Sequence, residues 1–417
     1  METEPICLLN VFYKIITKVL TLRLTRWAGK VISKKQTAFL PGRSILDGVV
    51  ILQEVLHELR VKKEEGVILK LDFEKAYDKV SWSFLEEVMI RKGFDSKWIG
   101  WTMQAVRGGR VAVDINGERG DFFRSFKGLR QGDPLSPLLF NLVADALSSM
   151  LSAAASAGDI EGLVPHLVEG GLTHLQYADD MIIFLKNSDQ NIANLKIILL
   201  CYEMMSGLKI NYNKSEVFVM GVEEEEKERI ATCFLCKVGQ LPITYLGMPV
   251  SDCKLSKAQL SYLSDKVGQR LGTWKCGNLS FGGKSVLINS CLSSIPMYTM
   301  AVYKLYEGNY QAIDSIRARF FWQGLGKKRK YHMVKWEAMQ RPKDYGGLGF
   351  IDVRIMNTCL LAKWIDRLER GDNTICGELL RKKYLGEKSI YQVHRRGVLN
   401  FGGAWLRQNS GLSGAGR

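Results

Sequence analysis

The stretch LTHLQYADDMIIFL, residues 172–185, decides the fold of this chain. Asp179 and Asp180 stand between two apolar runs that read as short strands. The pattern predicts a β-hairpin whose two-residue turn is Ala178-Asp179, with both acids at its tip. Neighbouring carboxylates repel each other, and a bound cation would offset that repulsion. A solvated surface turn is the alternative interpretation, and this stretch alone does not decide between the two.

A second apolar run, residues 67–71, ends in another carboxylate, Asp72. If this run lies beside the hairpin in one sheet, Asp72 meets Asp179 and Asp180 and the three form an oxygen-rich site. Small, hard dications such as Mg²⁺ take one or two carboxylates together with substrate phosphates. The sequence therefore predicts a magnesium site at the end of these strands.

A turn-rich segment, GLRQGDPLSP at residues 128–137, separates the two acidic segments and leads into an apolar helical run. Taken alone, it is a loop with a proline-marked entry to a helix. In the order Asp72, Gln131 and then residues 177–180, the chain resembles the reverse transcriptases of LINE-type (non-LTR) retrotransposons, most closely those of plants.

The resemblance extends from about Pro5 to about Leu385 and rests on an ordered set of stretches. These are QTAFLPGR at 36–43, residues 71–78, 128–137, 177–180, GLKIN at 207–211, Lys214-Ser215 and YLGMP at 245–249. Further on, residues 279–285, 320–322 and 346–349 are similar to the thumb and post-thumb of plant LINE polymerases. The resemblance implies an α+β fold of the right-hand polymerase type, with a palm built on a small antiparallel sheet.

The resemblance also implies a role for individual residues. Asp72 and Asp179, with Asp180 less directly, would hold two Mg²⁺ ions, for which Mn²⁺ is an alternative. Tyr77 would be the steric gate against a ribose 2′-hydroxyl; its alternative interpretation is an aromatic ring that packs on the sheet. Lys214 would protonate the leaving pyrophosphate, although a lone lysine is by default a solvated one.

Substrate-binding residues are implied in the same way. Gln131 would lie against the incoming nucleotide and the template, with Gly132 permitting close backbone approach. Arg43 would touch template or triphosphate. The expected partners are an RNA template, a DNA primer or target DNA and deoxynucleoside triphosphates, with an endonuclease in trans as a further candidate.

The expected organisation follows these assignments. Residues 1–250 would form fingers and palm, with the palm at 67–78 and 128–250; residues 251–345 would form a helical thumb, and residues 346–417 a truncated C-terminal connection and tail. Helices are predicted at 11–24, 47–63, 82–91, 138–151 and 192–205. A hairpin is predicted at 111–123 with Asn116-Gly117 as its turn.

Charge and composition fit an enzyme that binds nucleic acid. The 417 residues carry a formal charge of +15. Residues 251–417 hold 28 Lys and Arg against 12 Asp and Glu, whereas residues 1–250 hold 30 against 31. A basic thumb beside a nearly neutral palm suits contacts to phosphates. Nine scattered cysteines and no signal peptide indicate an intracellular, reducing setting. The uncharged run 285–303 is interpreted as a thumb helix and turn, and no membrane partner is expected.

The chain also departs from the family. Plant LINE polymerases usually read Arg-Pro-Ile-Ser-Leu where this chain reads EPICL, residues 4–8. Glu4 would repel the triphosphate, so an impaired polymerase is expected. The chain is also expected to be cut at both ends from a longer element, without the endonuclease that precedes the polymerase in this family. The alternatives are a non-catalytic nucleic-acid-binding remnant and, with less support, a group II intron-like maturase. A nuclear location is expected from the family's copying at chromosomal DNA.

Overall fold

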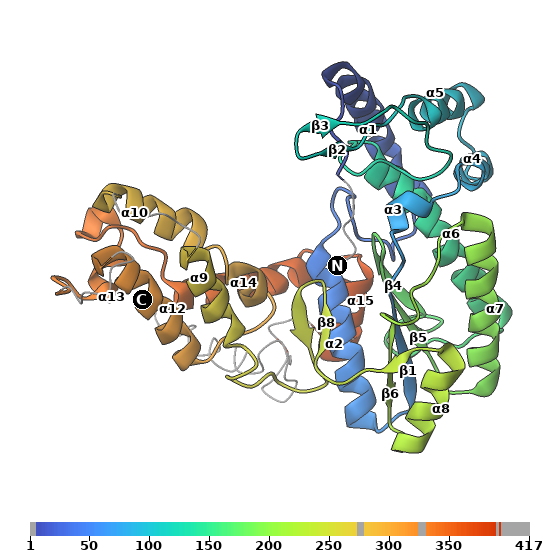
Figure 1. Cartoon of the computed structure of the whole chain (residues 1–417). Coiled ribbons are helices and arrows are strands. Elements are labelled where there is room, and N and C mark those ends of the chain that lie inside the picture. The colour runs from blue at the N-terminus through green and yellow to red at the C-terminus, as the bar shows by residue number, and fades with distance from the viewer. Residues whose placement is uncertain (1–5, 273–278, 324–330, 389–391, 393–417) are drawn as a thin grey trace. The chain divides into compact units, whose positions relative to one another are not determined.

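The structure is a computed structural model that describes residues 6–272, 279–323, 331–388 and 392 (Figure 1). The chain divides into two compact units. The first comprises residues 1–246 with 374–376, and the second comprises residues 247–373 with 377–417. The predicted fingers-and-palm boundary at residue 250 lies four residues from this division. Glu4 lies outside the described residues.

A five-stranded sheet forms the centre of the first unit. Its strands run in the order β4-β5-β1-β6-β7, with bounds His174–Tyr177, Asp180–Leu185, Gly66–Leu71, Glu216–Met220 and Lys237–Val238. Neighbouring strands are antiparallel except β6 and β7. The two strands predicted to carry the acids, β1 and β5, are therefore direct neighbours. The expected α+β palm with a small, mainly antiparallel sheet is confirmed.

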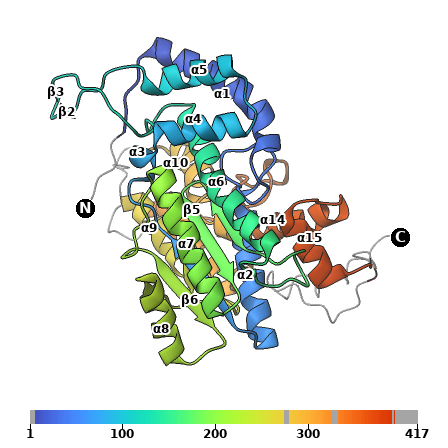
Figure 2. The same ribbon diagram turned by 90° about the vertical axis from the view of Figure 1, so that its right-hand side faces the viewer.

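Helices cover both faces of this sheet, which explains why its strands read as continuous apolar runs. On one face lie α6 (Ser136–Ala157), α7 (Asp189–Ser206) and α8 (Glu224–Phe234), and on the other lies α2 (Ile45–Lys62), as Figures 1 and 2 show. Alternate residues of β1 enter the core with α6 and α7, namely Val67, Leu69 and Leu71. Ile68 between them is also fully buried. Burying an aliphatic side chain of this kind contributes about 1.5–3 kcal/mol.

The longest apolar helix, α6, is a core element. It is the one described helix that is long and apolar enough to cross a membrane by length and composition, but 61% of that apolar window is buried inside the protein. Its first turn carries Pro137, which suits the start of a helix because its missing amide hydrogen would have no partner there. The predicted helix at 138–151 is confirmed and is longer at both ends.

Four further helices of the first unit lie above the sheet in the view of Figure 1. They are α1 (Val11–Val31), α3 (Ala76–Lys79), α4 (Trp82–Arg91) and α5 (Ser96–Arg107). The predicted helix at 82–91 is confirmed, whereas α5 was not predicted. The missed helix has an ordinary signature: Asp95 caps its N-terminus, and its buried residues Ile99, Met103 and Val106 have helical spacing. The predicted hairpin is confirmed as β2 (Asp114–Ile115) and β3 (Glu118–Arg119), with Asn116-Gly117 at the turn.

The second unit is mostly helical where it is described. Its helices include α9 (Tyr262–Gly272), α10 (Phe281–Leu287), α11 (Met297–Met300), α12 (Glu307–Gln323), α13 (Trp336–Met339) and α14 (Val353–Glu369). Its core is aromatic, with Phe320, Phe321 and Phe350 buried. Arg317 is fully buried and pairs with Asp314 at 2.8 Å. The helical character expected of residues 251–345 is present, and their role as a thumb stays a prediction.

Candidate active site

The turn between β4 and β5 presents the two adjacent acids. Tyr177 pairs with Asp180 across the hairpin, which leaves Ala178 and Asp179 as the two turn residues. Ala178 has a φ of 54°, the positive value that tight hairpin turns need. The predicted two-residue turn is confirmed. Asp179 lies exposed at its tip, and Asp180 begins β5.

The third acid, Asp72, follows β1 on the neighbouring strand. The last pair between β1 and β5 joins Leu71 to Met181, so one step further along the register Asp72 stands opposite Asp180. Residues opposite each other in antiparallel strands share one face of the sheet. Hydrogen bonds also hold the Asp72 backbone: its amide donates to Ser215 Oγ at 3.1 Å, and its carbonyl accepts from the Asn211 amide at 2.7 Å.

The electrostatics of this sheet edge favour a cation. Partial burial raises the pKa of Asp180, the nearby Lys70 ammonium lowers it and the Asp72 carboxylate raises it again. Asp72 and Asp180 therefore repel each other, and a dication would stabilise the pair.

The donor set fits Mg²⁺ as a partly formed site. No group of three or more His, Cys, Asp or Glu side chains is arranged to hold a metal in the part of the chain that the structure describes. One or two carboxylates plus substrate phosphates are sufficient ligands for Mg²⁺, and Asp72 and Asp180 are the two carboxylates that the register brings to this edge. That Asp179 joins them on a shared ion stays a prediction.

The Gln36 side chain accepts a hydrogen bond from the acidic turn, a role that the sequence did not predict. Its side chain is fully buried, and its Oε1 accepts from the amides of Ala38 and Ala178, each at 3.0 Å. The same segment is tied to β4, because Thr37 donates its amide to the Gln176 carbonyl at 3.0 Å. The amide of Ala178, which directly precedes Asp179 in the turn, thus bonds a side chain 142 residues away in the sequence.

Gln131 and Gly132 contact the start of the chain itself. The Gln131 carbonyl accepts from the Cys7 amide at 2.8 Å. Gly132 has a φ of +103°, and a Cβ there would lie 2.8 Å from the Cys7 carbonyl oxygen. The glycine is thus required for close backbone approach as predicted, but the backbone that approaches is that of Cys7. The contact of Gln131 with nucleotide and template stays a prediction.

Tyr77 lies in the short helix α3, which follows Asp72 in the chain. Its ring stacks on Phe140 of α6, with centroids 4.7 Å apart and planes 14° from parallel. Its carbonyl accepts from the Leu129 amide at 2.7 Å. The ring is packed on an aromatic side chain, but on that of helix α6 and not on the sheet as its alternative interpretation had it. The gate function stays a prediction.

The two predicted basic residues differ in position. Lys214 is exposed in a turn whose neighbours, Asn211 and Ser215, bond the Asp72 backbone, so the turn lies next to Asp72. Arg43 is used within the chain: its guanidinium donates to the carbonyls of Ile32, Ser33 and Gln36, and burial lowers its pKa. For Arg43 the structure shows a tie that shapes residues 32–43, and its contact with template or triphosphate stays a prediction.

A comparison with protein families supplies the context for this geometry. The family model described as reverse transcriptase (RNA-dependent DNA polymerase) matches residues 2–250. Those residues include the whole acidic edge, the Gln36 segment and the 128–137 turn.

Individual relatives cover more of the chain at lower identity. The chain is 27% identical over 357 residues to an uncharacterised 149 kDa protein of transposon TX1 from Xenopus laevis, covering 84% of this chain and 26% of that protein. It is 26% identical over 253 residues to a retrovirus-related Pol polyprotein of a type-2 retrotransposable element of Drosophila melanogaster, covering 59% and 22%. The chain thus spans about a quarter of the length of these relatives.

A plant protein and solved structures are also similar. A putative ribonuclease H protein of Arabidopsis thaliana is 32% identical over 137 residues, covering 33% of this chain and 22% of that protein. Apo telomerase from Candida tropicalis aligns with a TM-score of 0.43 and 14% identity, covering 89% of this chain and 61% of that one.

Proposed function

The chain belongs to the reverse transcriptase family, and from this premise we propose that it extends a DNA primer with deoxynucleotides along an RNA template. The observation that carries the proposal is the β1–β5 register, which sets Asp72 opposite Asp180 beside the turn that bears Asp179. The similarity of the chain to a transposon protein and to a Pol polyprotein of a retrotransposable element indicates a non-LTR retrotransposon as the source. Plant origin is supported by the similar Arabidopsis protein.

We propose that Asp72, Asp179 and Asp180 hold the Mg²⁺ ions of this reaction. When bound, two such ions stabilise the attacking and leaving oxygens of an in-line displacement at phosphorus. The chain's own contribution is to fix the carboxylates: β1 and β5 set Asp72 and Asp180, and Gln36 fixes the turn that holds Asp179.

The remaining roles are proposed on the positions described above. Tyr77, held against Phe140, would exclude a ribose 2′-hydroxyl because a stacked ring cannot move aside. Lys214, in the turn bonded to the Asp72 backbone, would donate a proton to the leaving pyrophosphate. Gln131 would contact the nucleotide through its side chain, since its carbonyl is engaged with Cys7.

Primer extension tests the proposal. Purified protein is mixed with a DNA primer annealed to an RNA template, deoxynucleotides and Mg²⁺, and product length is measured over time. Asp179→Ala should lower the rate at least a hundredfold while binding of the primer–template stays unchanged. Asp159→Ala, which removes another exposed aspartate of the same unit, is the matched control. Extension by Asp179→Ala at the unaltered rate would refute the proposed chemistry.

A second candidate is a non-catalytic protein that only binds nucleic acid. The observation that favours it is the formal charge of +15. This protein would bind duplexes with a steep salt dependence and incorporate no nucleotide at any Mg²⁺ or Mn²⁺ concentration. Template-dependent incorporation above that of Asp179→Ala would exclude it.

The cellular setting is proposed from the family. Copying primed by a nick in chromosomal DNA would place the chain in the nucleus and would need an endonuclease, in trans or on the same polypeptide. A fluorescent fusion in plant cells would test the location, and exclusion from the nucleus would contradict it.

A further inference from the structure

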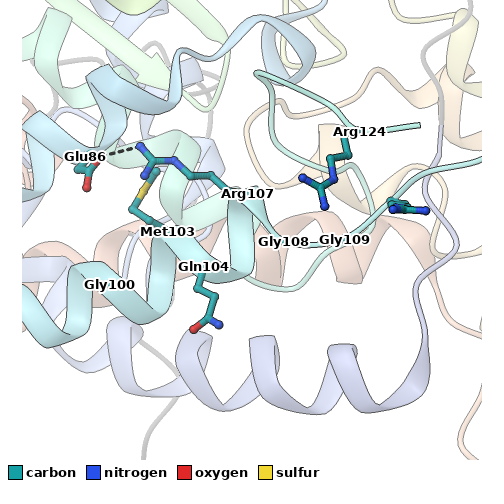
Figure 3. A pocket seen from close by; sticks show the side chains of 9 residues that line it. Glu86, Gly100, Met103, Gln104, Arg107, Gly108, Gly109 and Arg124 are labelled. Carbon is teal, nitrogen blue, oxygen red and sulfur yellow. Dashed lines mark hydrogen bonds and ion pairs between the residues drawn. The ribbon is translucent and has the colours of Figure 1, made fainter. Parts of the chain in front are cut away.

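A basic pocket lies at the C-terminal end of α5. It has a volume of about 650 Å³, and its lining includes Arg107, Arg110, Arg124, Gln104 and Glu86. Figure 3 shows Arg124 beside the Gly108-Gly109 backbone and Arg107 turned toward Glu86. The pocket has the size of a small-molecule or single-residue binding site, and its lining carries three cations against one carboxylate.

The local sequence explains the shape of this pocket. Gly108 ends α5, and a Cβ there would lie 2.5 Å from the Gln104 carbonyl oxygen. Gly109 follows with a φ of +102°, a conformation that glycine adopts without strain. The pair therefore turns the chain sharply, and Arg110 lines the pocket next to Arg107 of the last helical turn.

The arginines that line the pocket are not needed to cap α5. Arg130, which does not line it, donates to the carbonyls of Ala105 and Gly108 and so satisfies the helix end from another side. Arg107 pairs with Glu86 at 2.6 Å. Arg110 and Arg124 are exposed, and neither has a hydrogen-bonded or ion-paired partner within the portion of the chain that is described. Two such arginines can contact phosphate groups without first breaking an ion pair within the chain.

A second pocket continues the first. It has a volume of about 370 Å³, shares Arg107 and adds Lys79, Lys127, Trp82 and Phe126 to the lining. Phe126 is 86% exposed, so the face of its ring is accessible to a ligand. We call the two pockets together the basic strip, defined by Lys79, Arg107, Arg110, Arg124 and Lys127. Two of these cations are ion-paired, Lys79 with Glu74 and Arg107 with Glu86.

We propose that the basic strip binds single-stranded RNA, with phosphates on its arginines and an unpaired base stacked on Phe126. This inference rests on the proposed function only for the choice of RNA. Single strands are bound where a positive groove runs beside exposed aromatic rings, because every unpaired base has a face that can stack. A duplex presents its phosphates but hides its base faces, so it would use the cations and not the ring.

Fluorescence anisotropy with a labelled RNA of about 16 nucleotides tests the proposal. Binding is measured in EDTA, so that loss of polymerase activity and loss of the strip are distinguishable. Arg110→Gln with Arg124→Gln should weaken binding roughly tenfold, and losing two phosphate contacts should lower the slope of log affinity against log salt by about 1.4. Lys196→Gln with Lys237→Gln removes two exposed charges of the same unit outside the strip and is the matched control.

Two further variants separate the proposal from a general loss of charge or of fold. Glu86→Gln removes the one acid lining the larger pocket and should tighten binding several-fold, a gain that misfolding cannot produce. Phe126→Ala should weaken single-stranded RNA and leave an RNA duplex unaffected. The proposal would be overturned if the two double variants lost RNA affinity equally, or if Glu86→Gln bound RNA as the unaltered chain does. It would also be overturned if Phe126→Ala lost affinity equally for duplex and single-stranded RNA. An equal effect on single-stranded DNA of the same sequence would support it, since the strip reads phosphates and base faces common to both.

Discussion

Replacing Gln36 with Met is the sharpest test of how the acidic turn is held. Methionine keeps the length and volume of the side chain but removes the oxygen that accepts from Ala38 and Ala178. A buried amide left without an acceptor costs about 1–3 kcal/mol. Losing both bonds should therefore cost about 2–6 kcal/mol of unfolding free energy. Removing the Gln36 Nε2, which is buried without a hydrogen-bond partner among the described residues, should return about 1–3 kcal/mol of this.

The part of this cost that falls on Ala178 should reach the chemistry. The hydrogen bond to Ala178 accounts for about 1–3 kcal/mol. If all of this energy is needed in the transition state, its loss lowers the rate roughly 5- to 150-fold. We expect single-turnover primer extension to slow by about that factor, with little change in the KM for deoxynucleotides. Amide hydrogen exchange at Ala178 should quicken, and this readout does not require an active polymerase.

Asn191→Leu is the matched control for this experiment. Asn191 is also buried, and its amide bonds the backbone of Glu161 and Lys186 at 3.1 and 3.0 Å, away from the acidic turn. It should lose stability to a similar extent without changing Ala178 exchange or the extension rate. Wild-type exchange at Ala178 in the Gln36→Met protein, or equal slowing in both variants, would refute the reasoning.

Three further predictions concern charge. Burial lowers the pKa of Lys35 from 10.5, its value in the unfolded chain, to about 8 in the folded chain. Between these two pKa values the unfolded state holds the proton and the folded state does not. The free energy of unfolding should therefore rise with pH over this range. Urea unfolding should show this rise in the unaltered chain but not in Lys35→Met, and identical pH profiles would contradict it. Lys92 pairs with the buried Asp145 at 2.5 Å, so Lys92→Met should lower the free energy of unfolding by about 3–5 kcal/mol. In urea unfolding, the double variant Lys92→Met with Asp145→Asn should lose clearly less, because no charge is left unpaired. A loss below about 1 kcal/mol in the single variant would contradict this. Glu4→Arg should raise kcat/KM for deoxynucleotides if a negative charge there repels the triphosphate, and an equal gain in Glu2→Arg would trace the effect to net charge instead.

Some of the site can be read directly from the chain because it depends on local rules. The Ala178-Asp179 turn follows from two apolar runs separated by two residues, and the 82–91 helix from its spacing and its N-terminal serine. Helix α5 carries the same kind of signal, with Asp95 as cap and a helical apolar spacing, and could have been predicted from it. The family resemblance added the order of the acidic segments, which no local pattern supplies.

The sequence by itself determined which side chains could serve: three carboxylates, each at the end of an apolar strand, and a basic C-terminal part. Only the tertiary structure decided that β1 lies beside β5 in the register that sets Asp72 opposite Asp180. It also decided that Gln36 holds Ala178, that Arg43 bonds backbone carbonyls and that Arg107, Arg110 and Arg124 share one pocket. The physical reason is that turn and helix patterns are set by neighbours along the chain, whereas register, buried hydrogen bonds and shared pockets depend on contacts between residues distant in sequence.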